Sequence, residues 1–214
     1  MLTVPAAFTP LTFYPQWVLY QLRPRADGGT DKLPVDYRTG QLPAAGRGGS
    51  NIWADSDTIL AAAARYGAGY GSGFSFADSD PFWFIDLDKA LVDATETTPA
   101  HWAQWALDVV NALPGVAIEV SQSSKGLHLI GTGDIPNHAC KCPTDKRIEM
   151  YHVGRFVALT GYSAIGDAFC DATVQLANVV NRWFAPTASI APAIQHFDRE
   201  ADDDTIADLK DALT

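Results

Sequence analysis

The stretch PFWFIDLDKA (81–90) decides how this sequence is interpreted, because it joins an apolar run to two carboxylates. Its apolar and aromatic side chains predict a strand in the centre of a sheet. Residues i and i+2 of a strand share a face, so Asp86 and Asp88 project together while Ile85 and Leu87 enter the core. Two like charges so close repel each other unless a cation lies between them, and carboxylate oxygens favour Mg²⁺ or Mn²⁺. The competing interpretation is an edge strand kept soluble by its acidic residues.

A third carboxylate for such a site has to come from elsewhere in the chain. Glu149 has apolar neighbours on both sides in KRIEMY (146–151), which predicts a strand. It is therefore the best candidate to complete a metal site with the two aspartates, although an isolated Glu in a strand more often faces solvent. Arg155, just after a turn at 153–154, is equally open to a functional or a purely structural interpretation.

Groups suited to binding an anion gather in SSKGLHL (123–129), between two predicted strands. The stretch offers hydroxyl, ammonium, imidazole and adaptable backbone groups, from Ser123, Lys125, Gly126 and His128. Such groups at a hairpin turn predict a site for several oxygens of one anion, such as a phosphate chain. The Walker pattern G-x-x-x-x-G-K-[ST] is absent, and a single histidine on a strand is more often a packed core or surface residue.

The remaining sequence alternates between strand-like and helix-like patterns. Strands are expected at 17–20, 74–76, 116–120, 127–131, 147–151 and 155–161, the third and fourth forming a hairpin. Helices are expected from an Asp55 cap to about Tyr66, from a Thr98-Pro99 start to Leu113, and from about Asp171 to Trp183. The glycine-rich GAGYGSG (67–73) follows a helix and precedes a strand, the reverse of a dinucleotide-binding loop, so it does not predict one.

Composition excludes several classes of protein. The 214 residues are 47% hydrophobic, which allows one large domain or two small ones. No stretch reaches the roughly 18 apolar residues of a membrane helix, and the N-terminus lacks the basic start of a secretory signal. We therefore expect a soluble intracellular protein. Three cysteines, an odd number, fit a reducing compartment rather than a disulfide framework.

The net charge of −10 argues at first against nucleic-acid binding, because phosphate neutralisation needs Lys and Arg. The charge is unevenly distributed, however. Residues 198–214 hold seven acidic and two basic residues, a net of −5, so half of the excess lies there. The segment 23–49 is the most basic, with four arginines and Lys32, and we expect it to form an exposed hairpin or loop that contacts phosphates.

A zinc site is a further possibility in HACKC (138–142), from His138, Cys140 and Cys142. The single-residue spacers are tighter than the two to four residues usual between zinc ligands, and no fourth ligand is evident nearby unless Cys170 folds back. The competing interpretation is a loop with two inert thiols.

Taken together, FIDLD (84–88), SQSSKGLH (121–128) and RIEMYHVGRFVALTG (147–161) resemble the three motifs of the archaeo-eukaryotic primase superfamily, above all the primase-polymerase domains of phages and mobile plasmids. The likeness covers most of residues 13–184. It implies an α+β primase-polymerase fold, with an RNA-recognition-motif-like mixed or antiparallel catalytic sheet flanked by helices and an N-terminal αβ subregion. We expect a catalytic domain over 1–186 and an acidic linker, or the start of a truncated region, over 187–214.

The resemblance implies template-dependent nucleotidyl transfer, as a DNA primase, a DNA polymerase or both, with Mg²⁺ or Mn²⁺. By motif position, the metal ligands are Asp86, Asp88 and Glu149, and the residues at the nucleotide are His128, Ser123, Lys125, Gly126 and Arg155. Ser124 stands where relatives commonly have a second glycine. The implied partners are single-stranded DNA, nucleoside triphosphates and a helicase in the same polypeptide or operon, in the cytoplasm of a bacterial host cell and without a membrane.

Two other functions fit parts of the sequence. A sugar-nucleotide transferase also uses a D-x-D pair to hold a metal on a diphosphate, but needs no template. A non-catalytic nucleic-acid-binding module on an RNA-recognition-like sheet would present stacking aromatic residues on its strands, where this sequence offers acidic residues and a histidine.

Overall fold

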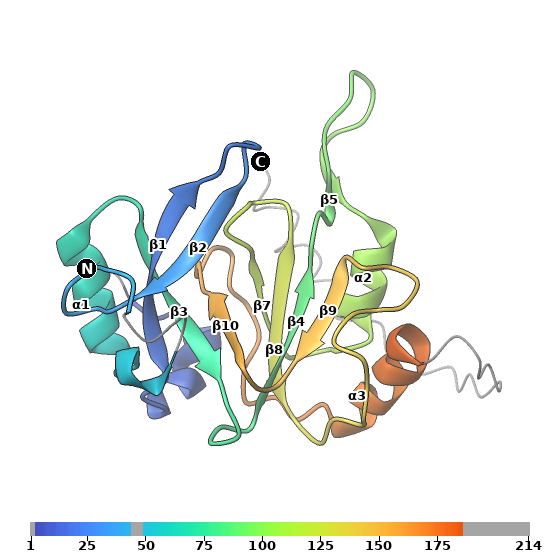
Figure 1. The fold of residues 1–214 in the computed structure, drawn as a ribbon. Coiled ribbons are helices and arrows are strands. Elements are labelled where there is room, and N and C mark those ends of the chain that lie inside the picture. Colours follow the sequence, from blue (N-terminus) through green and yellow to red (C-terminus); the bar gives the residue numbers. More distant parts are fainter. Residues whose placement is uncertain (1–2, 44–48, 186–214) are drawn as a thin grey trace.

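The computed structural model describes residues 3–43 and 49–185, which form two four-stranded antiparallel sheets, with helices on their outer sides, and one small two-stranded sheet (Figure 1). Sheet A has the order β10-β3-β1-β2, from β1 (Trp17–Pro24), β2 (Thr30–Val35), β3 (Tyr70–Phe76) and β10 (Arg155–Ala158). Sheet B has the order β7-β8-β4-β9, from β4 (Phe82–Leu87), β7 (Ala117–Val120), β8 (Leu127–Thr132) and β9 (Ile148–Tyr151). The chain therefore belongs to the α+β class, and both sheets are antiparallel rather than mixed.

Strand β4 is a central strand, as its sequence predicts, because it pairs with β8 on one side and with β9 on the other. Ile85 and Leu87 are fully buried in the core between sheet B and its helices. Phe82 and Phe84 project from the opposite face and pack in the core shared with sheet A. Asp86 continues this second face, so the alternation of side chains along β4 turns its carboxylate toward sheet A.

Helix α1 (Ser56–Tyr66) lies on the outer side of sheet A (Figure 1). The side chain of Asp55 accepts a hydrogen bond from the backbone N–H of Thr58 at 2.8 Å, which confirms the predicted N-cap. Gly67 ends the helix with a φ of 79°, a left-handed conformation that glycine adopts at low cost. Ile59 on this helix is fully buried in the core beneath the sheet.

The predicted helix start at Thr98-Pro99 is wrong. Helix α2 is Gln104–Asn111, and Trp102 belongs instead to β6 (His101–Trp102), which pairs with β5 (Leu91–Val92). The backbone N–H of Ala103 donates to the carbonyl of Ala90 at 2.8 Å, so strand pairing holds this segment extended up to the residue before the helix. Sheet pairing thus outweighs the local capping signal.

The last helical segment is close to its predicted range, with α3 (Thr173–Val179) followed by the π-helical turn η3 (Val180–Phe184). Two short 3-10 helices were not predicted, η1 (Ala6–Phe13) and η2 (Ser50–Ile52). The expected acidic linker over 187–214 lies outside the described residues. Among the helices that are described, none is long and apolar enough to cross a membrane.

Within the basic segment, β2 forms a hairpin with β1, one of the two predicted forms, and β2 lies at an edge of sheet A. Residues 44–48 of the segment lie outside the described residues. A second connection matters more for the site. Strands β9 and β10 follow each other closely in sequence but lie in different sheets. The chain crosses between the sheets at Gly154, which has a φ of 67° and donates its N–H to the carbonyl of Phe76 at 2.9 Å. The strand expected over 155–161 ends at Ala158.

Candidate active site

Four ionisable side chains form a single row across sheet B. Asp86 on β4 lies opposite His128 on β8 and opposite Glu149 on β9, and His128 lies opposite Glu119 on β7. Directly opposed residues of antiparallel strands have neighbouring side chains on the same face. Strand register therefore brings together three of the residues selected from the sequence, and adds Glu119. We call Glu119, His128, Asp86 and Glu149 the polar row.

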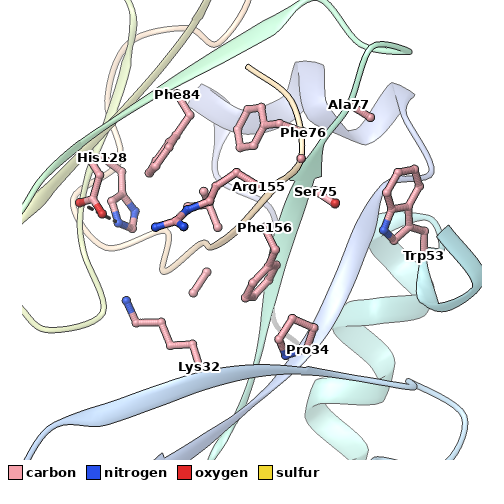
Figure 2. Close-up of a pocket in the computed structure, with 14 residues that line it drawn as sticks. Lys32, Pro34, Trp53, Ser75, Phe76, Ala77, Phe84, His128, Arg155 and Phe156 are labelled. Atoms are coloured by element: carbon pink, nitrogen blue, oxygen red, sulfur yellow. Dashed lines mark ion pairs between the residues drawn. The ribbon is translucent and has the colours of Figure 1, made fainter. Parts of the chain in front are cut away.

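Two members of the polar row, Asp86 and His128, border a cavity of about 530 Å³ between the two sheets. Sheet B contributes Asp86 and His128 to its lining, and sheet A contributes Lys32 and Arg155. Figure 2 shows the side chains of Lys32 and Arg155 extending toward His128 at one end of the cavity, with Trp53 at the other. A pocket of this size is within the range that holds small-molecule ligands, and its charged end combines cations with a carboxylate.

The surroundings of Asp86 shift the pKa of its carboxyl group in opposing directions. Burial raises the pKa of its carboxyl group above the ordinary value, and the negative charges of Asp88 and Glu149 raise it further, while His128 and Lys32 act in the opposite direction. The Oδ1 atom of Asp86 lies 3.9 Å from Nε2 of His128. Asp86 is thus repelled by the charges of Asp88 and Glu149, which is a condition that a bound cation relieves.

Glu149 is held by three neighbours in this structure. Lys141 forms an ion pair with its carboxylate, the hydroxyl of Tyr151 donates to Oε2 at 2.6 Å, and Arg155 lies 3.4 Å from the same oxygen. Burial alone would raise the pKa of Glu149, but the hydrogen bonds from Lys141 and Tyr151 and the nearby positive charges outweigh it and lower the pKa. The carboxylate is therefore ionised and already neutralised by cationic side chains.

Asp88 lies just beyond the end of β4 and is exposed, with its backbone N–H donating to the carbonyl of Arg147 at 2.8 Å. Across residues 3–43 and 49–185, no three His, Cys, Asp or Glu side chains are arranged closely enough to hold an ion. The donor chemistry nevertheless fits Mg²⁺ or Mn²⁺, since hard carboxylate oxygens on one face are the ligands these ions prefer. Assignment of Asp86, Asp88 and Glu149 as metal ligands remains a prediction.

The turn between β7 and β8 carries the other predicted nucleotide-binding residues. Ser123 is exposed and its hydroxyl lies 3.0 Å from that of Ser121. Lys125 forms an ion pair with Asp93 at 2.7 Å and is not among the residues that line the cavity. Ser124 has a φ of 58°, a left-handed conformation that costs a serine more than a glycine, so a glycine at this position in relatives has a conformational reason.

Gly126 has a packing role that its sequence did not reveal. The residue is buried, and a Cβ atom placed on it would lie 2.7 Å from the carbonyl oxygen of Leu87 and 2.9 Å from Oγ of Ser121. Its own carbonyl accepts the N–H of Ser121 at 2.8 Å, which closes the turn. Glycine is thus required for the turn to approach the end of β4 this closely.

Glu119 is the site residue that the sequence reasoning missed. It is fully buried, and its Oε1 lies 2.8 Å from Nδ1 of His128. A signal was present in the sequence, because a carboxylate inside the apolar strand VAIEV (116–120) is unusual and the hairpin register places it opposite His128. The sequence predicted phosphate contact only for the basic segment as a whole, and the structure distinguishes Lys32 as the charged residue of β2 that lines the cavity.

The HACKC segment does not assemble into a zinc site. Cys142 is buried, with the N–H of Asp145 donating to its sulfur, whereas Cys140 is exposed. The Nδ1 atom of His138 lies 2.9 Å from the carbonyl oxygen of Pro136. Within the part of the chain that is described, these side chains form no metal-binding group. The residue of this segment that reaches the site is Lys141, through Glu149.

Comparison with known proteins points in the direction that the motifs predict. No family model matches the chain. The chain is 32% identical over 158 residues to the DNA primase-polymerase of Nitratiruptor phage NrS-1. The match covers 72% of this chain and 20% of the phage protein, so the chain spans about a fifth of that relative's length. The superfamily resemblance of the three motifs and this match agree, and they show that the chain is a homologue of part of a phage DNA primase-polymerase.

Proposed function

We propose that this protein catalyses template-dependent nucleotidyl transfer, as a DNA primase, a DNA polymerase or both. The observation that carries the proposal is the polar row of sheet B, whose members Asp86 and His128 line one cavity together with Lys32 and Arg155 of sheet A. Homology to part of a phage primase-polymerase supports the same reaction class. The antiparallel sheet B, with helices on one side, is consistent with the RNA-recognition-motif-like catalytic sheet of a primase-polymerase fold.

In this proposal Asp86, Asp88 and Glu149 hold Mg²⁺ or Mn²⁺. Bound ions of this kind activate the attacking hydroxyl group and stabilise the leaving pyrophosphate in an in-line displacement. Binding at Glu149 requires Lys141 and Arg155 to release its carboxylate oxygens, which they engage in this structure. Arg155, which also lines the cavity, then becomes available to the nucleotide.

The side chains themselves position the nucleotide and neutralise its charge. His128 and Lys32 line the cavity from opposite sheets, where they are placed to contact oxygens of the triphosphate. Cations fixed beside a leaving group stabilise the negative charge that develops there during transfer. The turn with Ser123, Lys125 and Gly126 borders the same end of the sheet, and Lys125 reaches the phosphates only after leaving Asp93.

We propose residues 1–186 as the catalytic domain and 187–214 as an acidic linker or the start of a further region. The partners are a single-stranded DNA template and nucleoside triphosphates, with a helicase in the same polypeptide or operon. Since the matched relative comes from a phage, we place the reaction in the cytoplasm of the host cell.

The test is an incorporation assay on single-stranded DNA, with and without a primer, using labelled ribo- and deoxynucleotides and Mg²⁺ or Mn²⁺. We expect incorporation that needs both template and metal and is absent in the Asp86→Ala, Asp88→Ala double variant, whose circular dichroism spectrum stays unchanged. Metal-dependent incorporation by that variant would refute the assignment. DNA binding that is indifferent to Mg²⁺, without incorporation by the wild-type chain, would instead identify a binding module. Transfer from a sugar nucleotide without a template would instead identify a sugar-nucleotide transferase.

A further inference from the structure

Glu119 is a carboxylate in an apolar surrounding. It is 0% exposed and lies on β7 between residues that are buried in the protein core. Transferring a carboxylate out of water is costly unless hydrogen bonds and charge replace its hydration. A fully buried position of this kind would be filled more stably by an apolar residue, so the acid needs a specific explanation.

One half of the carboxylate is fixed by the backbone. Oε2 of Glu119 accepts hydrogen bonds from the N–H of Thr160 at 2.9 Å, from its hydroxyl at 3.0 Å, and from the N–H of Gly161 at 2.7 Å. Three donors on one oxygen leave the side chain little freedom to rotate. These bonds replace part of the hydration that the carboxylate loses on burial.

The other half of the carboxylate faces His128. Oε1 lies 2.8 Å from Nδ1, and since a carboxylate is an acceptor only, the imidazole donates an N–H from Nδ1. His128 is 3% exposed, and its ring also makes an edge contact with Phe84, with centroids 5.2 Å apart. The ring is thus fixed in orientation, with Nε2 turned toward Asp86 and the cavity.

We propose that Glu119 is a positioning residue that acts through His128. It keeps a hydrogen on Nδ1 and thereby directs Nε2 to an oxygen of the bound triphosphate. With Nδ1 bonded to Glu119, the ring presents Nε2 to the cavity, and a hydrogen on Nε2 is the donor to a phosphate oxygen there. This proposal rests on the proposed function, because it takes the ligand at Nε2 to be a nucleotide phosphate.

The rival role for Glu119 is purely structural, as a clip between β7 and the segment that follows β10. A double-mutant cycle separates the two roles, with Glu119→Gln, His128→Ala and the combined variant. We expect Glu119→Gln to raise KM for the nucleotide and lower kcat, with a loss in kcat/KM of about 10- to 100-fold, as for other outer partners of functional histidines. In the His128→Ala background the same substitution should change kcat/KM by less than about threefold.

Asp80→Asn is the matched control, since Asp80 is a partly buried carboxylate that accepts several hydrogen bonds, including one from Gln16 at 2.6 Å, outside the cavity lined by His128. It should leave the nucleotide KM unchanged. If Glu119→Gln lowers kcat/KM equally in both backgrounds, Glu119 is only a clip and the proposal is overturned.

A measurement on the wild-type chain covers the case in which Glu119→Gln does not fold. The ¹⁵N shifts of the His128 ring, measured without nucleotide, should show a protonated Nδ1. An unprotonated Nδ1 would overturn the proposal. This measurement does not depend on activity, so it distinguishes a failure of the positioning role from a failure of the proposed function. A wild-type chain with a protonated Nδ1 but no nucleotidyl transfer would keep the Glu119–His128 contact. It would refute the nucleotide as the ligand at Nε2.

Discussion

The two sheets that border the cavity differ in the charge they contribute and in the strands that carry it, which are central in sheet B and at the edges in sheet A. In sheet B, Asp86 and His128 lie on the two central strands. In sheet A, Lys32 and Arg155 come from the two edge strands, β2 and β10. Asp86 and His128 are therefore fixed by hydrogen-bonded strands on both flanks, whereas Lys32 and Arg155 are long side chains on strands with one free flank.

This difference teaches how a metal-and-phosphate site can be divided between layers. Carboxylates that hold an ion need exact mutual placement, which paired strands supply through register. Cations that follow a flexible phosphate chain need reach and freedom instead, which Lys and Arg on edge strands provide. Four substitutions test the division, beginning with the one expected to have the largest effect.

Asp86→Asn removes the central charge of the polar row while keeping the shape of the side chain. We expect nucleotide incorporation to fall to background, measured by primer extension. Because the folded state raises the pKa of Asp86, ionising it at neutral pH opposes folding, so the variant should melt at a higher temperature than the wild type in the absence of metal.

The pH dependence of that gain has a definite sign. A raised pKa means that the wild type loses stability as pH rises from the ordinary Asp pKa of about 3.9 through the raised value. The advantage of Asp86→Asn should therefore be present at pH 7 and disappear at pH values below the ordinary pKa. A variant that melts below the wild type at pH 7 would contradict this account of the charge.

Gly126→Ala tests whether the turn of sheet B depends on close packing. The added methyl group would meet the carbonyl oxygen of Leu87, so the turn has to move away from the end of β4. We expect a loss of about 1–3 kcal/mol in the free energy of unfolding, measured by urea denaturation, together with weaker incorporation. Gly28→Ala provides a comparison, since its Cβ would meet nothing within 4 Å and only its φ of 81° is unfavourable.

Lys32→Ala tests the cationic side. Losing one charged contact to the triphosphate should raise KM for the nucleotide about tenfold, measured by steady-state extension on a fixed template. Arg25→Ala on the same hairpin is the control, because Arg25 is paired with Asp27 and Asp31, and it should leave KM unchanged. If Lys125→Ala raises KM more than Lys32→Ala, the phosphate lysine is the one from sheet B and the division between the sheets fails.

Asp55→Ala has the smallest expected effect and separates scaffold from site. The residue caps α1, behind sheet A, and loss of a helix cap costs about 1 kcal/mol. Backbone hydrogen bonding holds the pKa of Asp55 below its ordinary value, so its contribution is present above the unfolded pKa and is lost as pH falls through the folded one. Thermal melting at pH 7 should show the loss, with KM for the nucleotide unaffected.

The sequence by itself determined the local features of this protein. The two-residue period of β4 predicted that Asp86 lies on the opposite face of the strand from Ile85 and Leu87. Asp55 marked the start of α1 as its N-cap. Both features depend on geometry within a few residues. The sequence also showed the resemblance to primases, because the order of the three motifs along the chain is visible without a structure. It failed at Thr98, where pairing of β6 with β5 replaced the expected helix.

Only the tertiary structure decided which side chains meet. Strand pairing and the packing of the two sheets bring together residues that are distant in the sequence. They produce the contact of Glu119 with His128 and the ion pair of Lys141 with Glu149, and they place Lys32 at the cavity. The separation of β9 and β10 into different sheets is of the same kind, since a short turn at Gly154 is equally compatible with a hairpin. Such contacts depend on register and on the burial of whole faces, which are properties of the complete core rather than of any local stretch.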